Sequence, residues 1–217
     1  MVTVIVQLQE KLATNTWVEA NWGIYINTIE SPDREKNQGY YYNGYMRIED
    51  MPTGADHSRY HIIVTFAINL FCTIGGIAIN GLDNCSYRKI GIRECQPDLS
   101  YYCGERARLA PIGKSVVNLD EAATPDLVIE ISNTTINDDL GAKRLLYEEM
   151  GVSEYWIVDV QNTLIYAFEM IDRGSRRIDT SLVLPNLSIE TIATALNLSK
   201  EQNQTQIGQW LMKEFQT

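Results

Sequence analysis

The sequence predicts an α/β fold with one mixed central β-sheet flanked by α-helices. Segments whose apolar residues alternate, as in β-strands, lie between segments whose apolar residues recur every three to four positions, as in α-helices. The chain has 217 residues, of which 45% are hydrophobic and 21% are charged. This length and composition are typical of a globular protein with one substantial core. No apolar run reaches the roughly 20 residues that a membrane-spanning helix needs.

The first half of the chain contains two predicted helices and a hairpin. Residues 15–29 place apolar side chains on one side of a helix, and residues 58–74 repeat them at helical spacing until a Gly-Gly pair. Between these helices, an Asn-Gly turn at Asn43 and Gly44 joins two strand-like segments, as in a β-hairpin. Short strands are expected around three further segments: 77–80, 87–93 and 98–103.

The second half contains the most regular strand of the sequence. A buried strand is predicted over 126–132, followed by a helix that runs to Met150 and ends at Gly151. A hairpin (154–160 and 163–171), a polar turn (172–177) and two amphipathic helices (190–198 and 205–215) complete the chain. We divide the chain into an N-terminal segment and helix that pack on the core (1–30), the core itself (31–186) and the C-terminal helices (187–217).

Charge and cysteine content limit the functions that the sequence allows. The net charge of −10 counts against nucleic-acid binding without excluding it, because such proteins gain affinity by neutralising phosphates. Basic residues still form three clusters, which are either solvated loops or DNA contacts: Arg88, Lys89 and Arg93; Arg106, Arg108 and Lys114; Arg173, Arg176 and Arg177. The four cysteines are irregularly spaced without a C-x-x-C pair, so free thiols in a reducing cytoplasm are expected. The apolar opening "MVTVIVQLQEKL" lacks the basic start and cleavage site of a signal peptide.

The strand 126–132 carries carboxylates that are costly to bury. Alternate side chains of a strand share a face, so Leu127, Ile129 and Ile131 form an apolar face that packs in the core. The opposite face holds Asp126, Val128, Glu130 and Ser132, and it must look into a polar environment.

The following helix presents a polar stripe toward this strand. Asp139, Lys143 and Tyr147 are spaced by four residues, so they lie on one side of the helix, and Lys143 can reach Glu130. Upstream, Asp98 follows Pro97 at the start of another predicted strand. If the two strands are neighbours, Asp98 and Glu130 converge at their ends.

Two carboxylates and a lysine are the side chains that cation-dependent phosphodiester hydrolysis requires. Magnesium takes oxygen ligands and keeps several waters, and it orients and acidifies an attacking water. The lysine positions that water or stabilises the charge of the transition state. From spacing alone, a buried ion pair between Glu130 and Lys143, with Asp98 capping a turn, explains the same residues equally well.

Four further residues are candidates for a supporting role. Asp126 is either a ligand or only a cap at the start of the strand, and His57 is either a base or phosphate contact or a loop histidine packed at a helix start. Tyr147 supports Lys143 or simply packs. Ser132 lies on the same strand face as Glu130.

These motifs resemble the PD-(D/E)XK nuclease superfamily, and within it the Uma-type family of restriction endonucleases. The resemblance covers roughly residues 15 to 190, and its most specific part runs from "PDLVIEIS" to "EYWIVDV". The matching motifs, in order, are Asn43-Gly44, His57, Pro97-Asp98, Pro125 to Ser132, Asp139-Lys143-Tyr147 and Gly151 to Asp159.

The resemblance implies a restriction-endonuclease-like core, a DNA substrate and cleavage that depends on Mg²⁺ or Mn²⁺. A homodimer is expected as well, because a symmetric nuclease can cut both strands. Asp98, Glu130 and Lys143 would be catalytic, with Asp98 and Glu130 as metal ligands. Ser132 stands where the superfamily pattern has its lysine, so Lys143 would substitute for it in space. Tyr40 stands where many relatives have a glutamate, and Glu49 on the second hairpin strand is the candidate to serve instead.

Two other functions remain compatible with the sequence. One is a nuclease-like domain that binds DNA or a protein without cutting, which the net charge and Tyr40 favour. The other is a scaffold protein whose C-terminal helices form a dimer face. The sequence contains no separate DNA-reading module.

Overall fold

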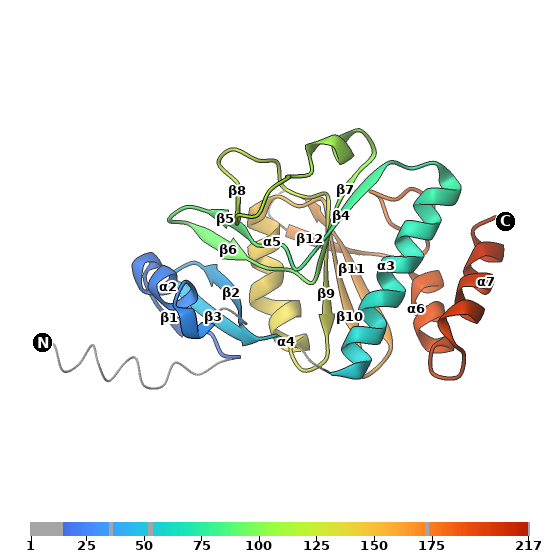
Figure 1. Cartoon of the computed structure of the whole chain (residues 1–217), viewed down its shortest axis with the longest axis horizontal. Coiled ribbons are helices and arrows are strands. Elements are labelled where there is room, and N and C mark those ends of the chain that lie inside the picture. Colours follow the sequence, from blue (N-terminus) through green and yellow to red (C-terminus); the bar gives the residue numbers. More distant parts are fainter. Residues whose placement is uncertain (1–14, 35–36, 52–53, 172–173, 217) are drawn as a thin grey trace, which may run out of the picture.

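The computed structural model describes residues 15–34, 37–51, 54–171 and 174–216, and confirms the α/β class (Figure 1). The strands are β1 (Val18–Glu19), β2 (Asn37–Tyr42), β3 (Tyr45–Asp50), β4 (Ile79–Asp83), β5 (Tyr87–Lys89), β6 (Arg93–Cys95), β7 (Leu99–Cys103), β8 (Val117–Asn118), β9 (Leu127–Ser132), β10 (Glu154–Asp159), β11 (Leu164–Ile171) and β12 (Gly174–Ile178). The helices are α2 (Trp22–Ile29), α3 (Ala55–Gly75), α4 (Ile136–Asp138), α5 (Arg144–Met150), α6 (Ile189–Leu198) and α7 (Gln204–Glu214).

The strands form two six-stranded sheets rather than the single sheet that the sequence predicts. The core sheet has the order β12-β11-β10-β9-β7-β4, and the N-terminal sheet has the order β1-β3-β2-β6-β5-β8. Within the core sheet β9 and β10 are parallel, while β7 is antiparallel to β9. The second sheet was not predicted because its pairings join short strands that are distant in sequence, and no local pattern specifies such pairings.

The core sheet is covered on both faces. Leu127, Ile129 and Ile131 of β9 pack with α3, α6 and α7, which confirms the predicted apolar face. Val128, on the other face, packs with α5 and with the N-terminal sheet. Figure 1 shows α3, α6 and α7 on one side of the core sheet, and α5 with the N-terminal sheet on the other. The polar face of β9 therefore looks into the space between the two sheets.

Most of the predicted elements are confirmed, with shifted ends. The hairpin forms at Asn43 and Gly44, and α3 ends at Gly76 in the left-handed conformation (φ 63°), which glycine adopts without steric cost. The predicted helix over 15–29 is shorter, because Val18 and Glu19 pair with β3 and α2 begins only at Trp22. The polar turn predicted at 172–177 is largely wrong, since Gly174–Ile178 pairs with β11 as an edge strand.

The helix predicted between β9 and Gly151 is interrupted. A π-helical turn over Asp139–Lys143 separates α4 from α5, and Gly141 within it has non-helical backbone angles. Gly151 ends α5 in the left-handed conformation (φ 80°), as predicted. The segment still covers the polar face of β9.

The C-terminal helices are part of the core. Ile189, Ile192 and Leu196 of α6 and Ile207 and Leu211 of α7 are buried against α3. Their apolar faces are therefore occupied within the chain, which removes the main reason to read them as a dimer face.

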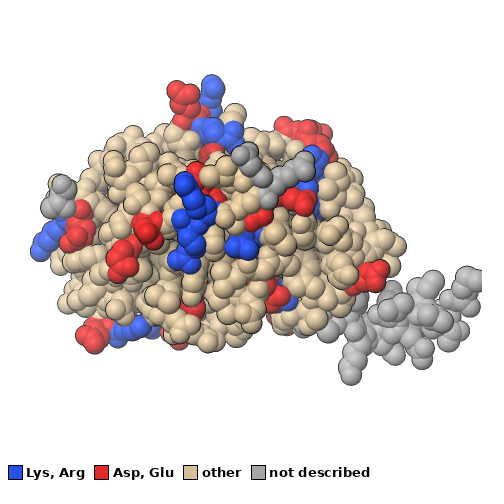
Figure 2. All heavy atoms as spheres, turned by 180° about the vertical axis from the view of Figure 1, so that it is seen from behind, with Lys and Arg blue, Asp and Glu red and all other residues tan. Residues whose placement is uncertain are grey.

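Charged side chains are distributed unevenly over the surface. On the face shown in Figure 2, acidic and basic side chains of the described residues are interspersed, with a column of Lys and Arg side chains near the middle.

Arg173 of the predicted basic turn and residues 1–14 lie outside the described residues. Within the described part of the chain, the helices are too short or too polar to cross a bilayer.

Candidate functional site

Asp98 and Glu130 converge as expected from neighbouring strands. The antiparallel register pairs Leu99 with Ile129, so its continuation by one residue places Asp98 opposite Glu130. The backbone N–H of Ile131 donates to Asp98 Oδ2 at 2.7 Å. Both carboxylates are buried and border the same cavity.

Lys143 is the cation at the centre of this group. Its Nζ lies 3.1 Å from Glu49 Oε2, 3.1 Å from Asp139 Oδ1 and 3.6 Å from Glu130 Oε2. The side chain is almost completely buried, with 2% of its surface exposed. The predicted approach of Lys143 to Glu130 is confirmed, and two further carboxylates share the same ammonium group.

Two tyrosine hydroxyl groups hold Glu130. Tyr147 donates to Oε1 at 2.7 Å, and Tyr40 donates to the same oxygen at 3.2 Å. The Tyr40 hydroxyl shares its single proton with the Gln96 carbonyl, which is the nearer acceptor at 2.8 Å. The Tyr40 ring centroid lies 4.1 Å from Lys143 Nζ. Tyr40 thus contacts both Glu130 and Lys143, in the position where a glutamate was expected.

Glu49 enters the site from the N-terminal sheet. Its Oε1 accepts a hydrogen bond from Arg47 Nε at 2.5 Å, while Oε2 accepts one from Lys143. Arg47 also pairs with Asp138 at 3.1 Å, which connects β3 to the start of the π-helical turn. Glu49 was proposed from the sequence only as a substitute for a missing acid, and the structure brings it into direct contact with Lys143.

His57, from the first turn of α3, lies next to Asp98. The distance between His57 Nε2 and Asp98 Oδ2 is 3.4 Å, and both side chains are buried. The histidine is therefore positioned to hold Asp98, and it also lines the cavity.

The pKa values of the buried groups in this site shift in different directions. Burial raises the pKa of Glu130 well above its ordinary value. The positive charge of Lys143 lowers this pKa, and the negative charges of Asp139, Asp98 and Glu49 raise it further. Burial alone would lower the pKa of Lys143, but Asp139, Glu130 and Glu49 raise it well above its usual range. Burial would raise the pKa of Asp98, but His57 and the Ile131 amide lower it.

These shifts assign a chemical role to each group. Lys143 keeps its proton near neutral pH, so it can donate to an oxygen or offset negative charge but cannot act as a base. Asp98 is a carboxylate over the same range. Glu130 is the carboxyl group of this site whose pKa is raised, chiefly by burial.

A cavity of about 260 Å³ gives access to this cluster. Asp98, Glu130, Lys143, His57 and Glu49 all line it, together with backbone and side chains of the turn 133–135. It opens where β9 ends, between the N-terminal sheet and the beginnings of α3 and α4.

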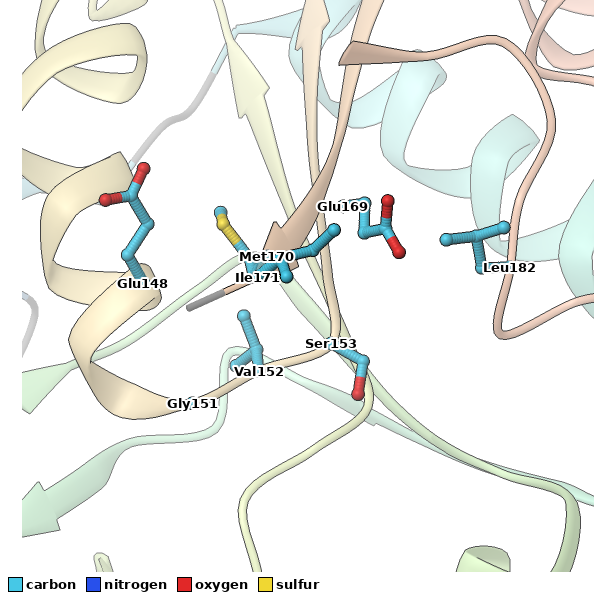
Figure 3. Close-up of a pocket in the computed structure, with 8 residues that line it drawn as sticks. All are labelled: Glu148, Gly151, Val152, Ser153, Glu169, Met170, Ile171 and Leu182. Atoms are coloured by element: carbon cyan, nitrogen blue, oxygen red, sulfur yellow. The ribbon is translucent and has the colours of Figure 1, made fainter. Parts of the chain in front are cut away.

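A second hollow lies at the opposite end of the core sheet. Figure 3 shows Glu148 on one side of it and Leu182 on the other, with Met170 and Ile171 between them. Its volume is about 410 Å³. One of its carboxylates, Glu169, pairs with Arg176 at 2.5 Å, and no buried lysine faces it among the residues that line it. The candidate site is therefore assigned to the smaller cavity, where the buried charges gather.

Asp126 does not join the cluster. It precedes Glu130 by four residues, which is roughly 13 Å along a strand. Its Oδ2 accepts the Cys103 amide at 2.8 Å and its Oδ1 accepts Arg106 Nε at 2.5 Å. Asp126 is therefore placed as a cap and ion-pair partner at the start of β9, the alternative to a ligand that the sequence left open.

Ser132 supports the turn that follows β9. Its hydroxyl lies 3.3 Å from that of Thr135, which in turn donates to Asp139 Oδ2 at 2.6 Å. This chain of contacts connects the end of β9 to the π-helical turn. Sequence spacing alone did not show that Asp139 pairs with Lys143 as well as shaping the turn.

The donor set fits a hard divalent cation. Magnesium binds through one or two carboxylates and keeps several waters. Among the residues that the structure describes, no group of three or more His, Cys, Asp or Glu side chains is arranged to hold a metal ion. Asp98 and Glu130 border the same cavity and are the two carboxylates that could hold such a cation.

Comparisons with known proteins identify the family of the chain and a similar fold. The sequence profile of the Uma2 family, described as "Putative restriction endonuclease", matches residues 27–200. The fold is similar to the crystal structure of a "putative nuclease belonging to DUF820" from Anabaena variabilis ATCC 29413. That similarity has a TM-score of 0.52 at 18% identity, and it covers 73% of this chain and 90% of the other. No curated protein gave a significant match. Since the family profile matches most of its length, the chain belongs to the Uma2 family.

Proposed function

We propose that the protein is an endonuclease that hydrolyses phosphodiester bonds of DNA with the help of Mg²⁺ or Mn²⁺. Family membership supports a restriction-type nuclease. The single observation that carries the proposal is the buried cluster of Asp98, Glu130 and Lys143 at one open cavity. Each buried charge costs several kcal/mol to desolvate, and groups with strongly shifted pKa values gather at functional sites.

Each residue has a role in this proposal. Asp98 and Glu130 would hold the cation, which when bound acidifies water and offsets phosphate charge. Lys143 keeps its proton, and its ammonium group stabilises the developing charge on a phosphate or hydroxide oxygen. Tyr147 and Tyr40 fix the orientation of Glu130, and His57 fixes Asp98.

A plasmid-nicking series tests the proposal. The wild type, Asp98→Asn and Lys143→Met are incubated with supercoiled DNA and Mn²⁺. Loss of either side chain is expected to reduce nicking by roughly 100-fold or more, the scale for removing one preorganised electrostatic group. Asp126→Asn is the matched control, because Asp126 lies on the same strand face outside the cluster, and it should stay within about threefold of the wild type. Unchanged nicking in Asp98→Asn and Lys143→Met would contradict the proposal.

A second function is favoured by one observation. Tyr40 occupies a position where an acid was expected, and its hydroxyl already engages Glu130. A nuclease-like domain that binds DNA or a protein without cutting would have this feature. It predicts no nicking by the wild type and DNA binding that is indifferent to Asp98→Asn.

The proposal includes a homodimer. Two copies related by a twofold axis present two sites to the two strands of a duplex, which suits symmetric cutting. Light scattering on the purified protein gives its mass directly, and a mass near 25 kDa, that of one 24.7 kDa chain, would contradict this part.

A further inference from the structure

Two arginines share an aromatic platform on the sheet face that also carries Glu130. Arg177 Cζ lies 4.7 Å from the Tyr166 ring centroid and 5.4 Å from that of Phe168. Arg144 Cζ lies 5.2 Å from the same Phe168 ring. We call these four residues the arginine ledge. Both guanidinium groups thus lie against the Phe168 ring, one from α5 and the other from β12.

These two arginines differ from most others in the chain. Arg144 Nε has no hydrogen-bond partner, and the nearest carboxylate oxygen, from Glu148, is 3.9 Å away. Within the described residues Arg177 has no carboxylate within 4.0 Å. By contrast, an acidic partner lies within about 3.1 Å of five others: Arg47, Arg88, Arg93, Arg106 and Arg176. Arg144 therefore has only a loose ion pair, and Arg177 carries a positive charge that no carboxylate of the described residues offsets directly.

The ledge is related to the candidate site by the sheet register. Glu130 pairs with Ile157, and Ile157 pairs with Tyr166, so Glu130 and Tyr166 occupy one cross-strand row. Two strand spacings separate them, roughly 10 Å. Arg144 directly follows Lys143, about 100° further around the helix. One residue thus faces the acids while the next faces β11 and β12.

We propose that the arginine ledge binds the phosphate backbone of the duplex DNA that the candidate site cuts. This inference rests on the proposed function and adds a contact surface beyond the cavity. A duplex has one phosphate per roughly 3.4 Å on each strand, so a duplex that spans the roughly 10 Å between the rows of Glu130 and Tyr166 presents several phosphates to this face. Phosphates bound at the ledge would offset the positive charges of the two guanidinium groups.

The chemistry of the ledge favours phosphate over other ligands. A guanidinium group stacked on a ring keeps its plane fixed, which suits bidentate contact to phosphate oxygens. Arg144 would use its terminal nitrogens for such a contact, because its Nε is buried. The aromatic rings are covered by the guanidinium groups, so they are not available for stacking with bases. The ledge is therefore expected to bind DNA without sequence preference.

The test measures DNA binding apart from cleavage. A fluorescein-labelled 30-base-pair duplex of arbitrary sequence is titrated in EDTA and again in Ca²⁺, at several NaCl concentrations, and anisotropy gives Kd. The Arg144→Gln/Arg177→Gln variant is expected to bind at least tenfold more weakly at about 0.1 M salt. The slope of log K against log salt is expected to fall by about two, one for each lost phosphate contact.

Matched variants separate this role from a structural one. Arg176→Gln removes the same charge from the adjacent position, which points to the opposite face of β12 and pairs with Glu169, so its Kd should stay within about twofold. The Arg144→Lys/Arg177→Lys variant loses stacking but keeps charge, so its salt slope should match the wild type. Thermal unfolding is recorded for each protein, and Arg177→Gln alone serves if the double variant does not fold.

The outcomes distinguish this inference from the proposed function. If the wild type binds the duplex and the double Gln variant binds equally well with the same salt slope, the ledge assignment is overturned and the nuclease proposal stands. If the wild type binds no duplex in either buffer, both are overturned. If Arg176→Gln and the double Gln variant lose the same DNA affinity, the effect comes from net charge alone, and the ledge assignment is overturned.

Discussion

At the scale of single residues, the unusual feature is how Glu130 is held. Two tyrosine hydroxyl groups donate to it, and one lysine shared by three carboxylates lies beside it. These contacts stabilise the ionised form only in part, because burial and the neighbouring carboxylates raise the pKa of Glu130. Burial and these neighbours therefore make Glu130 hold its proton more tightly than an exposed glutamate does.

The raised pKa of Glu130 makes a prediction about stability. A carboxyl group whose folded-state pKa lies above its unfolded value of about 4.3 binds its proton more tightly in the folded state. Raising the pH through that interval therefore destabilises the wild type, by up to about 1.4 kcal/mol per pH unit. Glu130→Gln cannot titrate. The unfolding free energy of Glu130→Gln, relative to that of the wild type, should therefore increase as the pH rises from about 4.5 to about 7.

Urea denaturation at several pH values measures this difference. The control is Glu149→Gln, which removes an exposed carboxylate of α5, and its difference from the wild type should stay nearly flat over the same range. The prediction is contradicted if the difference in unfolding free energy between Glu130→Gln and the wild type stays constant, or if it moves in favour of the wild type as the pH rises. Either result would mean that the pKa of Glu130 is not raised in the folded protein.

At the scale of elements, the sequence predicted which residues of β9 and of the following helix meet in the site. The alternation of β9 correctly separated the apolar side chains from Glu130, and the i, i+4 stripe correctly brought Lys143 and Tyr147 to it. The approach of Asp98 could be stated only as a condition, since it depends on β7 being the neighbour of β9. Glu49 and Tyr40 were named only through the resemblance, and spacing did not predict their contacts with Lys143 and Glu130. They are 94 and 90 residues from their partners and depend on how the second sheet docks.

The docking of α2 on the N-terminal sheet gives the prediction at this scale. A Cβ atom at Gly39 in β2 would lie 2.5 Å from the Tyr25 hydroxyl oxygen and 2.8 Å from Ile29 side-chain atoms, so α2 must move away. Gly39→Ala should therefore destabilise the protein by about 1–3 kcal/mol, as overpacking does.

The control for this change is Gly174→Ala in β12, where the nearest heavy atom would be 3.5 Å away at ordinary contact distance. Its unfolding free energy should change by less than about 1 kcal/mol. Equal midpoints of chemical denaturation for Gly39→Ala and Gly174→Ala would mean that the packing of α2 on β2 does not support this sheet.

At the scale of the whole molecule, the site lies at the seam between the two sheets. The core sheet supplies Asp98 and Glu130, the N-terminal sheet supplies Tyr40 and Glu49, and the segment that crosses from β9 to β10 supplies Lys143. An apolar cluster that joins both sheets holds these parts at fixed distances. The net charge of −10, which counted against nucleic acid in the sequence, is thus partly explained by acids that are buried in the site and not spread over a binding surface.

The central claim is that these buried carboxylates hold a cation that DNA cleavage requires. The most direct measurement is calorimetric titration of Mn²⁺ into the wild type and into Glu130→Gln, with plasmid nicking assayed on the same samples. We predict that the wild type binds Mn²⁺ and nicks the plasmid, and that the variant does neither. If neither protein binds Mn²⁺, or if both bind it equally, the acidic face of β9 is a structural network of ion pairs and the claim is contradicted.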